Sequence, residues 1–145
     1  MVMADAVRFV YVTNQEPAAT GTVPEWWSEF FFGGAANPAL DPDGDGMSTA
    51  QEYVAGTDPT KTSSRLRCRI EQVTNYGVNA TAHIAFVPYH EGRYYRLESK
   101  DDLGTNGWAD ANIPVYKLQN SDGDFPVGIP YSGQKFYRLR VQLAP

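Results

Sequence analysis

The stretch Asp41-Pro42-Asp43-Gly44-Asp45-Gly46-Met47-Ser48-Thr49-Ala50-Gln51-Glu52 satisfies every position of the calcium-loop pattern D-x-[DN]-x-[DN]-G-x5-E. Carboxylates at alternate positions can converge on one cation, and a glycine at the sixth position permits the sharp turn that this convergence needs. The glutamate at the twelfth position can close the coordination shell with two oxygens. The predicted metal ligands are therefore Asp41, Asp43, Asp45, Glu52 and, through its backbone carbonyl, Met47.

Every side-chain ligand in this stretch is a hard oxygen donor, and neither His nor Cys is close in the sequence. Such donors favour calcium over zinc or copper, and the need for roughly six or more oxygens favours calcium over magnesium. The predicted cofactor is therefore Ca²⁺. The alternative is an acidic, glycine-rich turn that is exposed to solvent and holds no ion.

The segment Asn120-Ser121-Asp122-Gly123-Asp124 is a second acidic candidate. It lacks the glycine and the distal glutamate that the pattern requires after Asp124. We predict a turn here, since Asn, Ser, Asp and Gly are typical turn residues. A second calcium ion near Asp122 and Asp124 stays as the alternative.

Short helices are predicted on both sides of the first loop. Thr22-Val23-Pro24-Glu25 has the form of a capping box with proline in the first turn, and we expect a helix at about residues 24–32. A second helix is expected to begin near Ser48, with Gln51 as its capping partner, and to end at Gly56. The first helix is too short to be stable alone, so its large aromatic surface must pack against another part of the chain.

Beyond Lys61 the pattern of apolar residues changes from helical to alternating. Strands are predicted at residues 6–13, 66–70, 79–87, 93–99, 112–118 and 135–143. Because no helices separate the later strands, the fold class is mainly β with a small α element. We predict an antiparallel β-sandwich of the immunoglobulin or fibronectin type, preceded by a helix, the calcium loop and a helix. The expected parts are an N-terminal strand and linker at 1–21, the helical calcium element at 22–62 and the sandwich at 63–145.

Charge is unevenly distributed in this chain of 145 residues with a formal charge of −5. Residues 1–62 hold two basic and nine acidic residues, whereas residues 63–145 hold ten basic and eight acidic ones. One bound calcium ion would offset part of the self-repulsion in the acidic part. The same charge argues against a nucleic-acid partner for this part.

Several functional classes are not expected. Cys68 is the only cysteine, so the chain can form no internal disulfide, and no apolar run is long enough for a membrane span. The first seventeen residues lack the basic region of a signal peptide. No nucleophile motif, phosphate loop or acid pair suggests an enzyme, and His83 and His90 are predicted to lie on the surface. The basic stripe of Arg65, Arg67 and Arg69 is predicted to be a solvated or cross-strand paired face.

The stretch from Asp41 to Pro59, which ends in Gly56-Thr57-Asp58-Pro59, resembles a bacterial thrombospondin type 3 repeat. The resemblance implies that calcium is bound structurally, in a secreted or cell-surface protein, beside a β-sandwich module. It also implies that Asp58 is an additional ligand or a helix-terminus cap. Other segments resemble carboxy-terminal segments of large exported proteins of Verrucomicrobia-like bacteria: the preceding Pro24-Glu25-Trp26-Trp27 and Phe31-Phe32-Gly33-Gly34, and the later Tyr95–Leu103 with Trp108 and Phe136–Arg140. The family often joins several repeats, whereas this chain has one complete motif.

These observations favour a non-catalytic, calcium-stabilised structural or assembly module of a secreted or cell-surface bacterial protein. Its partners would be neighbouring protein modules or copies of itself. Strand 6–13 could pair with a sheet edge of another chain and build a filament, although pairing within its own chain is the commoner arrangement.

The second functional interpretation is a carbohydrate-binding accessory module of a secreted enzyme, with a glycan as partner. Exposed aromatic residues would then act as stacking platforms. The candidates are Tyr89, Tyr94, Trp108, Tyr116 and Tyr131, although most of these are expected in the core. A calcium sensor or enzyme ranks last, because a lone loop suits a structural clip better than a switch.

Overall fold

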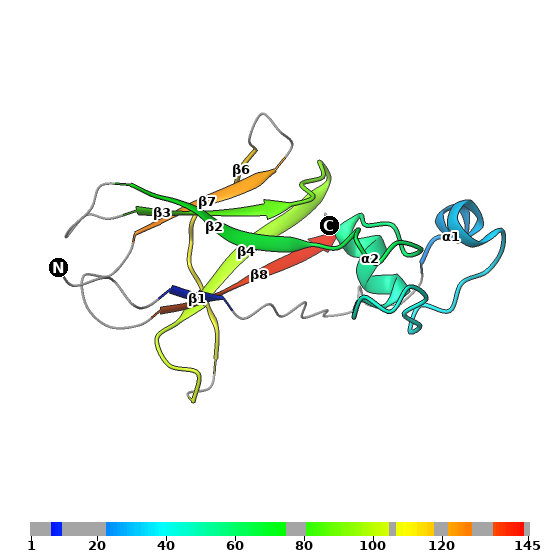
Figure 1. The fold of residues 1–145 in the computed structure, drawn as a ribbon, viewed down its shortest axis with the longest axis horizontal. Coiled ribbons are helices and arrows are strands. Elements are labelled where there is room, and N and C mark those ends of the chain that lie inside the picture. Colours follow the sequence, from blue (N-terminus) through cyan, green and yellow to red (C-terminus); the bar gives the residue numbers. More distant parts are fainter. Residues whose placement is uncertain are drawn as a thin grey trace.

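The computed structural model describes residues 7–9, 23–74, 81–104, 107–117, 122–128 and 135–143. The chain is mainly β with two small helices, as predicted. The helices are α1 (Glu25–Phe32) and α2 (Thr49–Ala55). The strands are β1 (Val7–Phe9), β2 (Arg67–Thr74), β3 (Thr81–Val87), β4 (Arg93–Lys100), β5 (Ala109–Asp110), β6 (Tyr116–Lys117), β7 (Gly123–Gly128) and β8 (Lys135–Leu143). Along the long axis, α1 lies at one end and α2 lies between α1 and the strands (Figure 1).

Helix α1 confirms the predicted first helix but begins one residue later. Pro24 occupies the N-cap position with φ of −59° and forms no side-chain cap. The N-cap is therefore not Thr22, the first residue of the predicted capping box, which itself lies outside the described residues. Proline suits this position because its fixed φ and missing N–H match the start of a helix. The helix ends at Gly33, whose left-handed φ of 69° lets its N–H bond to the carbonyl of Glu29.

Helix α2 confirms the second predicted helix at both ends. The Ser48 hydroxyl accepts a hydrogen bond from the Gln51 N–H at 3.3 Å, and the Gln51 side chain accepts one from the Ser48 N–H at 2.7 Å. The predicted capping box is thus present. Gly56 ends the helix with a φ of 77°, and a Cβ atom at this position would lie 2.4 Å from the His90 ring. His90 is exposed, as predicted, but it packs against the end of α2.

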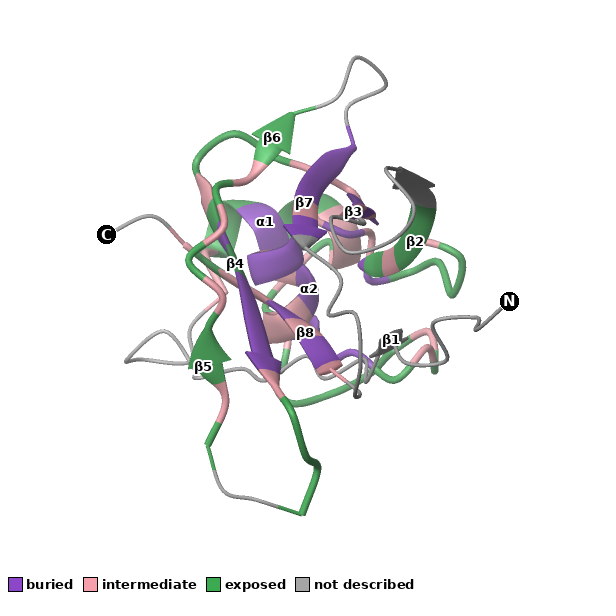
Figure 2. Cartoon of the chain, turned by 90° about the vertical axis from the view of Figure 1, so that its left-hand side faces the viewer, coloured by how far each residue is buried: buried purple, intermediate pink, exposed green. Residues whose placement is uncertain are grey.

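The strands form two four-stranded sheets, with the orders β1-β8-β4-β5 and β2-β3-β7-β6. Neighbouring strands run antiparallel in both sheets, except that β1 and β8 are parallel. One buried cluster takes residues from both sheets and also from the helical part; its members include Met47, Ala55, Ile84, Phe86, Leu97, Phe125, Tyr137 and Leu139. In Figure 2 the strands β3 and β7 are buried over most of their length and β4 and β8 over part of it, whereas β5 and β6 are exposed.

Two strands were not predicted, and one predicted strand is shorter in the structure. Strand β7 was not expected, because Gly123, Asp124 and Pro126 are rare in strands. A Cβ atom at Gly123 would lie 1.9 Å from the Phe86 ring, so this glycine serves close packing and not a turn. The predicted strand 112–118 is represented only by β6, since Pro114 cannot donate a backbone hydrogen bond. The short strand β5 was also missed.

Strand β1 pairs with β8 of its own chain, with Val7 opposite Lys135 and Phe9 opposite Tyr137. This is the arrangement that the sequence favours over pairing with another chain. The rest of the predicted strand 6–13 lies outside the described residues. Among the residues that the structure describes, neither helix is long and apolar enough to cross a membrane.

We expect Gly56→Ala to destabilise the fold by more than the left-handed backbone alone requires. A non-glycine residue in this conformation costs about 1–2 kcal/mol, and the added methyl group would also press against the His90 ring. The matched control is Gly33→Ala, because Gly33 has a similar φ of 69° and nothing within 4 Å of its built Cβ. Chemical denaturation of both variants measures the difference. Equal losses, or no recovery in the Gly56→Ala/His90→Ala double variant, would contradict the packing argument.

Candidate metal centre

The acidic loop is organised by the side chain of Asp41. Its Oδ1 accepts hydrogen bonds from the N–H groups of Gly44 at 2.8 Å and Asp45 at 3.2 Å, and its Oδ2 accepts one from Gly46 at 2.9 Å. Gly44 and Gly46 have φ values of 75° and 96°, a conformation that glycine adopts without strain. These bonds curl the backbone around one carboxylate and bring the neighbouring aspartates together.

The remaining aspartates each use one oxygen within the loop. Asp43 Oδ1 accepts from the Asp45 N–H at 3.1 Å, and Asp45 Oδ1 accepts from the Met47 N–H at 2.8 Å. Asp41, Asp43 and Asp45 each offer an oxygen within 4.8 Å of the others, and they form the one such group of metal-binding side chains found among the described residues. The structure therefore brings together the three predicted aspartate ligands.

Glu52 lies outside this group but is coupled to it electrostatically. Helix α2 carries it in its first turn, and its side chain is fully buried, with an exposed fraction of 0%. Its Oε1 accepts a hydrogen bond from the Thr57 hydroxyl at 3.3 Å. Burial, followed by the negative charges of Asp43 and Asp45, raises the pKa of Glu52 from 4.5 to about 8. A carboxylate held in this way retains a proton or requires a cation.

Three carboxylate oxygens in this region are buried and lack a hydrogen-bond partner among the described residues: Asp43 Oδ2, Asp45 Oδ2 and Glu52 Oε2. A buried polar atom without a partner costs about 1–3 kcal/mol, and more when it carries charge. Burial also raises the pKa of Asp43, whereas the Gly46 N–H lowers the pKa of Asp41 despite opposing desolvation. Carboxylate oxygens gathered in this way are suited to a cation with a preference for oxygen ligands.

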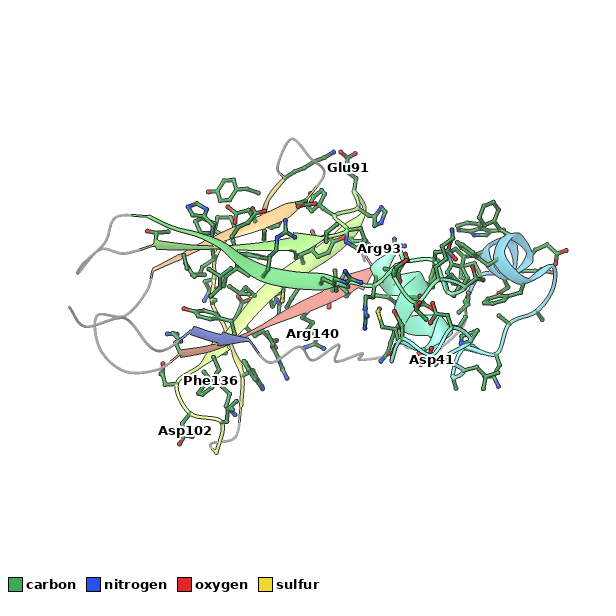
Figure 3. The ribbon with its side chains drawn as sticks, viewed as in Figure 1. Asp41, Glu91, Arg93, Asp102, Phe136 and Arg140 are labelled. Atoms are coloured by element: carbon green, nitrogen blue, oxygen red, sulfur yellow. The ribbon has the colours of Figure 1, made fainter. Side chains whose placement is uncertain are left out.

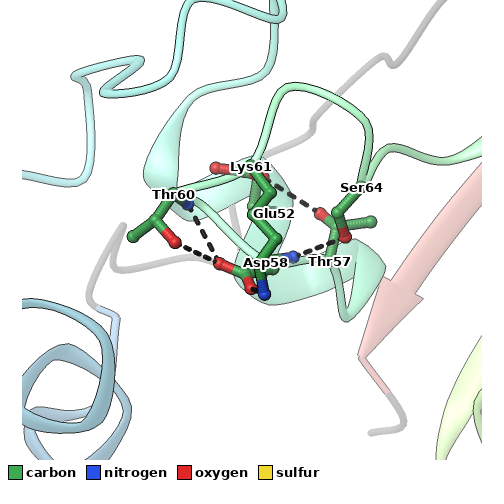
Figure 4. Close-up of polar contacts among 6 residues, drawn as sticks. All are labelled: Glu52, Thr57, Asp58, Thr60, Lys61 and Ser64. Carbon is green, nitrogen blue, oxygen red and sulfur yellow. Dashed lines mark hydrogen bonds and ion pairs between the residues drawn. The ribbon is translucent and has the colours of Figure 1, made fainter.

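Two further predicted ligands have other roles as well. Met47 is 1% exposed and its side chain belongs to the core cluster. Asp58 has both carboxylate oxygens engaged, since Oδ1 accepts from the N–H and hydroxyl of Thr60 and Oδ2 pairs with Lys61 at 2.5 Å (Figure 4). Burial opposes ionisation of Asp58, but the bonds from Lys61 and Thr60 outweigh it and lower its pKa. Asp58 thus shapes the turn after α2.

Sequence reasoning missed the contacts that fasten the loop to α2. The Leu40 carbonyl accepts hydrogen bonds from the Thr49 N–H at 2.7 Å and from the Thr49 hydroxyl at 3.0 Å. The Pro38 carbonyl accepts one from the Ala50 N–H at 3.0 Å. The bonds to Leu40 and Pro38 satisfy backbone N–H groups in the first turn of α2, which have no acceptor within the helix. The one feature of the sequence that could have indicated these contacts was Thr49, directly after the N-cap.

The other end of α2 is held by residues of the β part. Arg93, at the start of β4, donates from Nε to the Val54 carbonyl at 2.8 Å and from Nη2 to the Tyr53 carbonyl at 3.0 Å. His90 Nε2 lies 3.0 Å from the Gly56 carbonyl. Figure 3 shows Arg93 between the strands and α2. A cation at a helix C-terminus is favourable both for the last carbonyls and for the helix dipole. No short-range pattern predicts this contact.

The second acidic candidate is not a turn at Gly123 and Asp124, which belong to β7. Asp122 pairs with Arg69 at 3.1 Å, and Asp124 Oδ2 lies 2.9 Å from His83 Nδ1. The predicted cross-strand pairing of the basic stripe is confirmed for Arg69, while Arg65 and Arg67 are exposed. Residues 120 and 121, which begin the candidate segment, lie outside the described residues.

The described residues among the predicted aromatic platforms have different environments. Tyr94 and Tyr116 are exposed but lie in different sheets, and Tyr89 packs against the core. Trp108 lies beneath the guanidinium of Arg138, at 4.7 Å from its ring centroid. Tyr131 lies outside the described residues.

Comparison of the chain with protein-family models, with curated proteins and with solved structures found no match. The acidic loop therefore has to be interpreted from its own geometry. That geometry is a cluster of aspartates next to a buried glutamate on a helix that the β part holds in place.

We expect the metal-free chain to lose stability as pH rises from about 4.5 to about 8. The pKa of Glu52 is raised to about 8 in the folded chain, so the folded state keeps a proton that the unfolded state releases. Within this window the free energy of unfolding falls by about 1.4 kcal/mol for each pH unit. Urea denaturation in chelator across the window measures this slope. The Glu52→Gln variant should lack it, and a parent whose stability is flat or rises with pH would disprove the assignment.

Proposed function

We propose that this chain is a non-catalytic structural module whose acidic loop binds one calcium ion. The observation that carries this proposal is the set of three buried carboxylate oxygens, on Asp43, Asp45 and Glu52, that have no hydrogen-bond partner in the part of the chain that the structure describes. An ion bound between these side chains and Asp41 would satisfy all three oxygens. The Met47 carbonyl would supply a further ligand.

The donor set supports calcium in particular. Every candidate ligand atom is a carboxylate or carbonyl oxygen, which suits hard cations and not zinc or copper. Calcium accepts irregular shells of six to eight oxygens, whereas magnesium demands a near-ideal octahedron of about six. Asp58 is outside the group of aspartate oxygens, and its own oxygens are bonded to Thr60 and Lys61. We therefore assign Asp58 to the turn and the remaining predicted residues to the ion.

The proposed mechanism is structural. Calcium would let Glu52 ionise, and because α2 carries Glu52, the ion would link the loop directly to the helix. Arg93 and His90 attach the other end of α2 to the β part. One ion would thus stabilise the path from the acidic loop through α2 to the strands. In this proposal residues 22–62 form a helix, calcium loop and helix of the thrombospondin type 3 kind, and residues 63–145 form a β-sandwich.

An extracellular location is part of the proposal. A single loop of the weak kind fills with calcium only where calcium reaches the millimolar range, as it does outside cells. The module would serve a secreted or cell-surface protein, with other modules or further copies as its partners. Its expected contribution is to keep a connection between modules rigid.

We expect calcium to stabilise the parent chain and to have no such effect on Asp43→Asn or Glu52→Gln. At a calcium concentration about 100 times the dissociation constant, a single site adds about 2.7 kcal/mol to the free energy of unfolding. Urea denaturation in calcium and in chelator measures the gain, and calorimetric titration measures a stoichiometry of one ion per chain.

The matched control is Asp58→Asn, which removes a nearby carboxylate that is bonded to Thr60 and Lys61. This variant should lose some stability but keep the full response to calcium. The proposal fails if the parent unfolds identically in calcium and in chelator. A lost response in Asp58→Asn would instead return Asp58 to the ligand set.

A further inference from the structure

Helix α1 exposes two large aromatic side chains. Trp26 and Phe30 are 68% and 78% exposed, and they lie one helical turn apart on the same face. The opposite face of the helix is buried, because Trp27 packs edge-on against Tyr53 with ring centroids 5.6 Å apart. The exposed aromatic residues are therefore not needed to hold α1 in place. Adjacent exposed apolar residues of this size mark interaction surfaces.

Two acidic residues border these aromatic residues. Glu25 and Glu29 are exposed and also lie one turn apart, next to Trp26 and Phe30. In the part of the chain that the structure describes, neither carboxylate has an ion pair. We call Glu25, Trp26, Glu29 and Phe30 the α1 face. Its negative charge disfavours an anionic membrane surface and favours a partner that is cationic.

A basic surface, with a charge opposite to that of the α1 face, lies at the edge of the second sheet. Arg65 and Arg67 are exposed on either side of the buried Leu66, and Arg67 begins β2, an edge strand. Arg67 donates to the Ser63 carbonyl at 3.2 Å, and among the described residues neither guanidinium pairs with a carboxylate. Arg69, by contrast, is paired with Glu71 and Asp122. We call Arg65 and Arg67 the β2 stripe.

Arginine can satisfy both parts of the α1 face at once. Its guanidinium stacks on aromatic rings and donates in its plane to carboxylates. The chain already contains this combination, since Arg138 lies 4.7 Å from the centre of the Trp108 ring and also pairs with Glu98. Within one chain the α1 face cannot use the β2 stripe, because α2 lies between α1 and the strands (Figure 1). A second copy can supply it.

We propose that the α1 face of one copy binds the β2 stripe of a second copy. Glu25 and Glu29 pair with Arg65 and Arg67, and the guanidinium planes cover Trp26 and Phe30. The contact joins two different surfaces, so it either closes as a reciprocal dimer or continues as a head-to-tail chain. It uses none of the calcium ligands and so stands independently of the calcium proposal.

A charge exchange tests this contact. Variant one is Glu25→Arg/Glu29→Arg, and variant two is Arg65→Glu/Arg67→Glu. Each variant alone juxtaposes like charges, and we expect association to weaken at least tenfold relative to the parent. An equimolar mixture should regain the parent's association, because each α1 face then meets a stripe of opposite charge. Sedimentation equilibrium over a concentration series measures all four samples.

Two controls separate this contact from other effects. Glu91→Arg/Asp101→Arg reverses two exposed acidic residues elsewhere, each paired with one lysine, and should leave association unchanged. The calcium-dependent gain in stability should be the same in both charge-exchange variants as in the parent. A parent that is monomeric at every soluble concentration overturns the proposal. So does association that survives both variants, or a mixture that stays monomeric.

Discussion

The structure depends on Glu52, a glutamate that is buried without a cationic partner among the described residues. Glu52 has no exposed surface, and Asp43 and Asp45 lie near enough to raise its pKa further. A carboxylate in this position is costly when ionised, yet the α2 helix cannot turn it outward, because the loop is tied to the helix start through Leu40 and Thr49. Removing this free-energy cost requires a proton on the Glu52 carboxylate or a cation beside it. The stability of the helical part is therefore controlled by what occupies the site.

This control extends to the strands because α2 is attached at both ends. At the start of the helix, the capping box and the loop contacts fix the first turn. At its end, Arg93 donates hydrogen bonds to two of the last carbonyls. Met47 and Ala55 also belong to the same buried cluster as the apolar residues of the two sheets. The helical part and the β part thus share one core. A change at Glu52 is transmitted through packed side chains and not through a flexible linker.

The local features of this chain could be predicted from its sequence, and the long-range ones could not. The loop and α2 follow from short patterns, namely alternate aspartates, a serine with a glutamine three residues later, and a terminal glycine. Gly123 carries the same local signal as a turn glycine, but its role is set by the Phe86 ring on a distant strand. Arg93 likewise reaches α2 from about forty residues away along the chain. The calcium-loop pattern therefore selected the aspartates and Glu52 as candidate ligands, but it did not predict the contacts that hold them in place.

The two proposed interactions differ in how they respond to solvent. The calcium site gathers buried oxygens, so salt screens it weakly, whereas the contact between the α1 face and the β2 stripe joins exposed charges and is screened strongly. Residues 1–62 carry a formal charge of −7, and a calcium ion bound in the proposed site would reduce the repulsion between neighbouring copies. Calcium should therefore favour association even though it touches neither surface. A module built in this way would be rigid and ready to associate in the same calcium-rich medium.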